Sequence, residues 1–239
     1  CTNRGISVLN KEAMKFGGRP TLPFVNYSVS DGLPDEVVWT AFQDAEGVVW
    51  LGTNDGFSKV LKINTSDQQS LKFTNSKLGL SHQVVTAIIQ DRDGLLWIGT
   101  KNGLTTLNTT LPEGKRYSYY NVSDGLSHDS ISSLLEDNQG RIWVGTENGF
   151  SQFIPIEKRN SNKSFIGFSM INGTQLSRIN TISEDHNGSV WFGCWSGQGV
   201  IQYEPERNRF FRYTSKNGLV GDNVISILED TENNLWFGT

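Results

Sequence analysis

The sequence predicts an all-β fold made of a repeated four-stranded unit, and three observations support this fold class. A ten-residue motif, seen most clearly in Asp91 to Thr100, recurs five times with the pattern Asp-x-x-Gly-x-x-Trp-x-Gly-Thr. Segments rich in β-forming residues flank each copy. The copies keep a near-constant period of 45 to 48 residues, which is typical of repeat architectures. The tryptophans that define this period are Trp50, Trp97, Trp143, Trp191 and Trp236.

Each copy of the motif predicts a β-hairpin. The turns begin at Asp44, Asp91, Asp137, Asp185 and Asp230. An Asp side chain can accept hydrogen bonds from turn amides, and the Gly three residues later supplies a positive φ. In the fifth copy this Gly is replaced by Asn233. Because Asn also tolerates the left-handed region, we expect Asn233 to have a positive φ.

A second turn follows the tryptophan strand, as at Asp55-Gly56, Asn102-Gly103 and Asn148-Gly149. These dipeptides are strong hairpin signals between β segments. One period therefore holds about four short strands joined by hairpins, which is the content of a β-propeller blade. We expect the five motif tryptophans to pack between neighbouring sheets, each burying on the order of 200 Å².

The repeat pattern also predicts the blade boundaries. Four whole blades are expected at residues 36–77, 83–124, 129–172 and 177–216. Residues 1–30 match the second half of a blade, and residues 222–239 match the first half of another. These halves either join and close a five-bladed ring, or the chain is an arc of a larger ring. Within the third blade, we expect residues 154–176 to form a long surface loop.

Composition and charge argue against several classes of protein. The 239 residues carry a formal net charge of −4 and the pI is near 5.4, so no basic footprint supports nucleic-acid binding. No apolar run approaches the ~18 residues of a membrane-spanning helix. Two cysteines are too few for a disulfide framework. Since neither an initiator Met nor a signal peptide is present, we expect the sequence to be part of a longer protein.

No catalytic or metal-binding motif accompanies the repeats. His82 and His128 occupy equivalent positions in Gly-Leu-Ser-His and are assigned to a turn, and we expect His186 to be solvated. No His-x-x-x-His or Cys-x-x-Cys spacing occurs in the sequence. The motif aspartates are expected to cap their own hairpins rather than to form a ring of carboxylates. We therefore predict no catalytic residue, no metal site and no cofactor.

Two further tryptophans lie outside the repeat pattern and are the candidate ligand-binding residues. Trp39 lies five residues before Asp44 in the expected innermost strand. Other copies have smaller side chains there, namely Thr86, Ser132, Asn180 and Ile225. Trp195 lies in Cys194 to Gly199, where neighbouring copies have a tighter turn. Flat aromatic rings suit stacking on sugar faces. The alternative is that both rings pack locally.

The segment Asp124 to Ile131, followed by Glu136 to Thr146, resembles the two-component regulator propeller repeat. Leu78 to Thr100 is an equally close match, and the resemblance covers the whole chain. It implies the extracytoplasmic sensor region of bacterial hybrid histidine kinases, on the periplasmic or extracellular side of a membrane-anchored parent. Such regions are typically seven-bladed propellers, so we favour an arc of a larger ring.

The resemblance also implies a function. We expect a sensing module, not an enzyme, that recognises an oligosaccharide or other small molecule and signals to downstream kinase modules of the same polypeptide. The full-length protein is expected to be a homodimer, without a nucleic-acid partner. Two alternatives stay open. Asn187 to Gly193 is similar to the blade motif of streptogramin lyases, enzymes that need a His and acidic residues with magnesium. The other alternative is a structural propeller that binds proteins.

Overall fold

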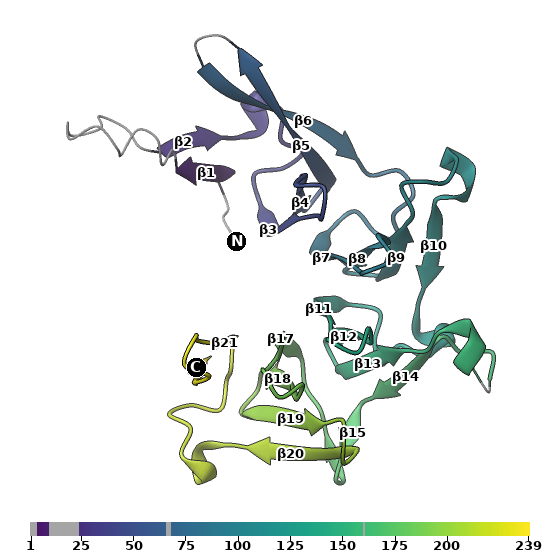
Figure 1. Cartoon of the computed structure of the whole chain (residues 1–239), viewed down its shortest axis with the longest axis vertical. Helices are drawn as coiled ribbons and strands as arrows, with labels where there is room; N and C mark the ends of the chain where they lie inside the picture. Colours follow the sequence, from purple (N-terminus) through teal and green to yellow (C-terminus); the bar gives the residue numbers. More distant parts are fainter. Residues whose placement is uncertain (1–3, 10–23, 66–67, 160) are drawn as a thin grey trace. The chain divides into compact units, whose positions relative to one another are not determined.

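The computed structural model of the chain describes residues 4–9, 24–65, 68–159 and 161–239. In this part of the chain the regular elements are β-strands and short 3-10 turns (Figure 1). This confirms the predicted all-β fold class. The chain divides into two compact units, residues 1–78 with 83–85 and residues 79–82 with 86–239.

The first unit contains a four-stranded and a two-stranded antiparallel sheet. The larger sheet has the order β3 (Val38–Gln43), β4 (Val49–Thr53), β5 (Gly56–Thr65) and β6 (Gln68–Ser76). The smaller sheet pairs β1 (Ile6–Leu9) with β2 (Phe24–Tyr27). Tyr27 packs edge-on against Phe73 of β6, with ring centroids 5.7 Å apart. The two sheets therefore share one apolar core.

The second unit repeats the four-stranded sheet three times, and the strands of each sheet follow one another in chain order. The first sheet is formed by β7 (Val85–Gln90), β8 (Leu96–Thr100), β9 (Gly103–Leu107) and β10 (Tyr117–Tyr120). The second is formed by β11 (Ile131–Glu136), β12 (Ile142–Thr146), β13 (Gly149–Phe153) and β14 (Phe165–Phe168). The third is formed by β17 (Ile179–Glu184), β18 (Val190–Cys194), β19 (Val200–Glu204) and β20 (Arg209–Tyr213).

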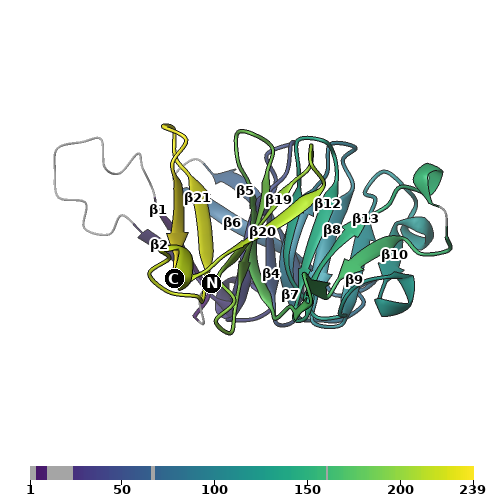
Figure 2. The same ribbon diagram turned by 90° about the horizontal axis from the view of Figure 1, so that it is seen from below.

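Two small sheets complete the second unit. One pairs β15 (Met170–Ile171) with β16 (Thr174–Gln175), and the other pairs β21 (Ser226–Glu229) with β22 (Leu235–Gly238). Figure 1 shows its larger sheets following one another, with β7, β11 and β17 on the inner side, where β21 also lies, and Figure 2 shows β8, β12 and β19 of these sheets from below. This is the blade arrangement of a propeller. The predicted blade boundaries, and the choice between a closed ring and an arc, stay predictions.

Short 3-10 turns lie in the connections between strands. η2 (Val29–Asp31), η4 (Val122–Asp124) and η6 (Ser215–Asn217) precede innermost strands, while η3 (Glu113–Lys115) and η5 (Ile156–Lys158) lead into fourth strands. The turns η2, η4 and η6 each end at a glycine with φ between 104° and 106°. Only glycine adopts this conformation without strain, which explains the recurring Gly after each turn.

Aromatic side chains fill the space between neighbouring sheets of the second unit. Trp143 of β12 contacts Phe150 of its own sheet and Phe192 and Tyr203 of the next sheet. Phe150 and Phe192 stack across the same boundary with their ring centroids 3.9 Å apart. Aromatic pairs in such contacts contribute about 0.5–1.5 kcal/mol beyond the area that they bury. The repeated tryptophan therefore sits where one sheet packs on the next.

The second glycine of the motif allows the innermost strands to approach closely. A Cβ atom on Gly99 would lie 2.6 Å from Cγ2 of Ile131, the first residue of the next sheet. A Cβ atom on the equivalent Gly145 would lie 3.1 Å from Cγ2 of Ile179, and one on Gly193 would lie 3.0 Å from Cγ1 of Val224. A side chain at these positions would push neighbouring sheets apart.

The expectation that residues 154–176 form a long surface loop was wrong. The segment contains η5, strand β14 and the hairpin β15–β16. Phe165 of β14 is buried, and its ring lies 5.4 Å from that of Tyr120 and 5.3 Å from that of Phe153. The polar residues before Phe165 are typical of a loop, and for this reason the fourth strand that follows them was not predicted.

Candidate ligand-binding site

Each motif aspartate is engaged by its own hairpin. Asp91 Oδ2 accepts a 2.7 Å hydrogen bond from Nε1 of Trp97, while Oδ1 accepts from the amides of Asp93 and Leu95. The indole bond recurs at 2.7–2.8 Å in the pairs Trp50–Asp44, Trp143–Asp137, Trp191–Asp185 and Trp236–Asp230. These carboxylates are therefore held within separate turns.

One motif tryptophan departs from the expected packing between sheets. Trp50, Trp97, Trp143 and Trp191 are buried, whereas Trp236 is 62% exposed. Trp143 is covered by Phe150 and Phe168 of the third and fourth strands of its own sheet. The sheet of Trp236 has only β21 and β22 among the described residues, so no such strands cover its ring. The expectation of burial was wrong for this copy.

Trp39 lies at a β-bulge in the innermost strand of the first unit. The register of β3 and β4 shifts between Val38 and Thr40, which leaves Trp39 as the extra residue. Its side chain is 37% exposed, and its indole Nε1 donates a 2.8 Å hydrogen bond to Asn54 Oδ1. The polar end of the ring is thus used within the protein, which leaves only a partly open ring face for stacking.

The bulge position has a different role in the second unit. Ser132 and Asn180 are the extra residues of β11 and β17. Asn180 Nδ2 donates to the carbonyl of Val224 at 3.0 Å, and the Ser132 hydroxyl donates to the carbonyl of Ile179. Both bonds reach the next sheet. The large Trp39 is therefore a change of side-chain type at a position that elsewhere links sheets.

Trp195 lies in the second unit, at the end of β18, in a connection that is longer than its equivalents. The Thr100 hydroxyl closes its turn by donating to Gly103, three residues on. In the longer connection, the amide of Cys194 donates to the carbonyl of Gly199, five residues on. Trp195 is 46% exposed in this loop. The insertion presents an aromatic ring to solvent.

Hydrogen bonds hold this longer loop, residues 195–199, in place. The Trp195 amide donates to the Arg178 carbonyl at 2.9 Å, and the Trp195 carbonyl accepts from the Ser177 hydroxyl at 2.6 Å. Gln198 Oε1 accepts from the Ser177 amide, and the Gly197 amide donates to Asn223 Oδ1, both at 2.8 Å. The loop backbone is therefore anchored on both sides of the exposed ring.

Charged side chains lie at the same end of the sheets as Trp195. Lys101 and Glu147 each follow the final Thr of their motif, as Trp195 follows Cys194. Glu147 Oε1 lies 3.4 Å from Lys101 Nζ and 3.4 Å from Nη1 of Arg178. The Arg178 backbone in turn accepts the amide of Trp195. We call Lys101, Glu147, Arg178 and Trp195 the blade-end cluster.

Sequence reasoning found one residue of the blade-end cluster and missed three. Trp195 was singled out because its residue type breaks the pattern. Lys101 and Glu147 occupy variable turn positions, and Arg178 precedes an innermost strand, so nothing marked them as a group. The signal that existed was positional, because Lys101, Glu147 and Trp195 are equivalent in the repeat. Trp39 belongs to the first unit, and Trp195 belongs to the second.

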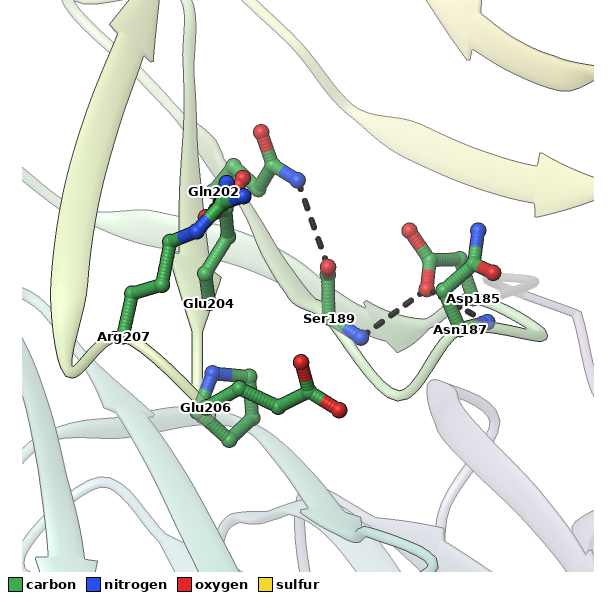
Figure 3. A pocket seen from close by; sticks show the side chains of 8 residues that line it. Asp185, Asn187, Ser189, Gln202, Glu204, Glu206 and Arg207 are labelled. Atoms are coloured by element: carbon green, nitrogen blue, oxygen red, sulfur yellow. Dashed lines mark hydrogen bonds and ion pairs between the residues drawn. The ribbon is translucent and has the colours of Figure 1, made fainter.

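A polar cavity of about 350 Å³ lies at the other end of the β17–β20 sheet (Figure 3). It is lined by Asp185, Asn187, Ser189, Gln202, Glu204, Pro205, Glu206 and Arg207. Arg207 pairs with Glu204 at 3.0 Å, and Gln202 Nε2 donates to the Ser189 hydroxyl at 3.2 Å. In Figure 3 the Glu206 carboxylate points toward the turn of Asp185 and Asn187.

The preceding sheet explains why this cavity exists. Arg141 is the counterpart of Ser189, since each lies four residues after its motif aspartate. The Arg141 guanidinium binds Asp137 and lies 5.5 Å from the ring centroid of Tyr203, a third-strand residue of the next sheet. In the described residues, β21–β22 has no third strand to cover the face of Ser189. The cavity is an uncovered packing face, so we do not assign a ligand to it.

Two of the three histidines, His128 and His186, make local contacts in the structure. His128 Nδ1 accepts the amide of Ser130 at 2.9 Å, as suits a turn residue. His186 pairs with Glu229 of the next sheet, so it is not simply solvated as expected. Among the residues that the structure describes, no group of three or more His, Cys, Asp or Glu side chains is placed to hold a metal ion. Burial raises the pKa of the Cys194 thiol to about 12, so it is inert near neutral pH.

Four-stranded antiparallel sheets that repeat in chain order, each locked by an Asp–Trp pair, define a β-propeller repeat protein. The model of the two component regulator propeller family matches residues 32–55, 79–102, 125–148, 175–196 and 218–239. The chain belongs to this family, as the resemblance implied. A search of the curated proteins finds no match. No helix in the described ranges is long and apolar enough to span a membrane.

Solved structures share the fold at low sequence identity. An extracellular domain described as that of the hybrid two component system BT4673 of B. thetaiotaomicron is 19% identical with a TM-score of 0.65, over 84% of this chain and 28% of that one. PorZ, a surface component of the type-IX secretion system of Porphyromonas gingivalis, is 16% identical with a TM-score of 0.66, over 90% of this chain and 33% of that one. Virginiamycin B lyase of Staphylococcus aureus is 14% identical with a TM-score of 0.64, over 98% of this chain and 70% of that one.

Proposed function

We propose that this chain is part of the extracytoplasmic sensor region of a two-component signalling protein and that it binds a carbohydrate-like ligand at the blade-end cluster. The family match and the similarity to an extracellular two-component domain support the sensor class. Because the chain spans only 28% of that domain, the kinase output and the homodimer belong to the proposal as well. Ligand binding would bias the signalling state only through a difference in affinity between its two states.

The observation that carries the ligand site is the exposed ring of Trp195 on an anchored loop. An exposed tryptophan on a flexible loop would lose conformational entropy when it stacks on a ligand. Here the amide and the carbonyl of Trp195 are both hydrogen-bonded, to Arg178 and Ser177. The backbone is therefore already ordered before binding. Polar groups of Ser177, Gln198 and Asn223 surround the loop.

Calorimetry on the intact extracytoplasmic region with a panel of oligosaccharides tests this site. Trp195→Ala should weaken binding about tenfold, because aromatic stacking contributes ~1–2 kcal/mol. Trp195→Phe keeps a ring and should retain most of the affinity. Tyr119→Ala removes another exposed aromatic of the same unit and serves as the matched control. Trp39→Ala tests the second candidate, which we expect to contribute less because its indole N–H is bound to Asn54.

The streptogramin-lyase alternative is favoured by one observation, the shared fold over 98% of this chain. It makes a different prediction. The chain, incubated with magnesium and a cyclic streptogramin B, would convert the antibiotic to a linear product that mass spectrometry detects. A sensor would leave the antibiotic intact and would still bind its own ligand. If the amount of linear product rose in proportion to the protein concentration, the enzyme alternative would replace the sensor proposal.

A further inference from the structure

The blade-end cluster has an excess of positive charge in addition to its aromatic ring. Lys101 and Arg178 both contact Oε1 of Glu147, so two cations share one carboxylate oxygen. Both contacts are 3.4 Å long, which is beyond the ~2.7–2.9 Å of a strong charge-assisted hydrogen bond. Glu147 therefore neutralises only part of the charge that faces it.

Arg178 retains unused hydrogen-bonding capacity. Its Nε atom is buried and has no hydrogen-bond partner, while the side chain as a whole is 40% exposed. A guanidinium presents its N–H groups as a fixed fork that matches a carboxylate or sulfate. Surface ion pairs contribute little to stability, so the contacts of Lys101 and Arg178 with Glu147 add little to the stability of the fold.

Two acidic side chains at this end of the sheets, Asp129 and Asp222, are directed elsewhere. Asp129 Oδ1 accepts the amide of Val122, and Asp222 accepts the amide and the hydroxyl of Ser215. Both carboxylates thus cap outer 3-10 turns. Arg212 Nε donates to the carbonyl of Gln198 within the loop of Trp195. The loop is therefore flanked by Arg178 and Arg212.

We propose, resting on the function proposed above, that the ligand is an acidic glycan whose carboxylate or sulfate group is bound by Arg178 and Lys101 while a sugar ring stacks on Trp195. Arg178 is close enough to Trp195 for one short oligosaccharide to reach both, because their backbones are hydrogen-bonded to each other. The anion takes the place of Glu147 as a partner of Arg178. The chain as a whole carries a net charge of −4, so this preference comes from the local cluster.

An array of neutral, uronate-containing and sulfated oligosaccharides, probed with the intact extracytoplasmic region, gives the first test. The strongest binders should be acidic. Calorimetry then compares the best acidic binder with its neutral form, prepared by methyl esterification or desulfation. The acidic form should bind at least about tenfold more tightly, since hydrogen bonds to charged groups are the stronger ones, and added salt should reduce the difference. The uronate and sulfate arms distinguish the two sources of charge.

Matched variants connect that preference to the cluster. Arg178→Gln should reduce the ratio of the two affinities, acidic form over neutral form, to about one, and this ratio is the readout whatever the variant does to the overall affinity. Arg207→Gln removes an exposed, paired arginine at the other end of the same sheet and should change neither affinity. Equal binding of acidic and neutral forms, or a preference that survives Arg178→Gln, overturns the charge inference while the sensor proposal stands. If no glycan binds, both proposals fail.

Discussion

Trp97 Nε1 donates a 2.7 Å hydrogen bond to Oδ2 of Asp91, the residue that begins its hairpin. The same carboxylate accepts two turn amides through Oδ1. One side chain therefore closes the turn and also fixes the orientation of the ring that packs against the next sheet. This link between turn and core explains why the Asp and the Trp recur together at a spacing of six residues.

Truncation of this tryptophan should be costly. Trp97 is 2% exposed and its ring contacts Phe153 of the next sheet at 4.9 Å. Trp97→Ala should lower the free energy of unfolding by about 3–5 kcal/mol, through lost contacts and a cavity. The exposed Trp236 provides the control, and Trp236→Ala should cost about 1 kcal/mol or less. Urea denaturation of both variants measures this, and a loss below ~1 kcal/mol for Trp97→Ala would show that the packing role is wrong.

The motif glycine makes a separate prediction about the approach of two sheets. Gly99→Ala places a methyl group 2.6 Å from Cγ2 of Ile131, and such overpacking typically costs about 1–3 kcal/mol. Gly114 has no heavy atom within 4 Å of the corresponding Cβ position, so Gly114→Ala should be neutral. Thermal unfolding compares the two. Equal melting temperatures for both variants would mean that the sheets separate at no cost.

The repeat pattern predicted the strands because each blade uses the same hairpin chemistry. The Asp-x-x-Gly turns and the Asn-Gly turns are local signals, and Asn233 has φ 65° as its replacement of Gly indicated. The fourth strand at Phe165 to Phe168 was missed because polar residues separate it from its neighbouring strand at Phe153, and because Tyr120, against which Phe165 packs, is distant in sequence. Arg178 and Glu147 were not predicted as a pair, because a contact between residues of successive repeats leaves no local pattern in the sequence. Trp195 was found because it interrupts a repeated turn.

The left-handed residue Asn233 gives a test that does not depend on packing. Gly at this position removes the strain of a positive φ, so Asn233→Gly should be neutral or mildly stabilising. Asn233→Ala should destabilise the protein by about 1 kcal/mol, because Ala disfavours this region of backbone space. The melting temperatures of the two variants should therefore move in opposite directions or differ clearly. A stable Ala variant would contradict the observed φ of 65°.

Glu184 provides a prediction about pH. Burial, and then the nearby Asp137 and Asp185, raise the pKa of this carboxyl above its usual value, against the amide of Asn138 and the charge of Arg141. A raised pKa in the folded state means that the stabilising protonated form is lost as the pH rises through that pKa. Glu184→Gln should therefore match the parent in acid and be at least as stable near neutral pH.

The matched control for Glu184 lies in the preceding sheet. Glu136 is the equivalent residue, and it accepts hydrogen bonds from the backbone and the guanidinium of Arg92 at 2.9 Å and 2.6 Å. Glu136→Gln removes one partner of that ion pair and should lower stability modestly near neutral pH. Chemical denaturation at several pH values separates the two cases. A Glu184→Gln variant that loses stability as Glu136→Gln does would remove the proposed effect of burial.

Ligand binding at Trp195 is tested directly by the indole N–H signals of the seven tryptophans. In an NMR titration of the sensor region with the best-binding oligosaccharide, the Trp195 signal, assigned with Trp195→Phe, should shift and saturate with ligand. The signals of Trp97 and Trp143 should stay in place, because their indoles are buried and bound to Asp91 and Asp137. A ligand that binds without moving the Trp195 signal would contradict the account.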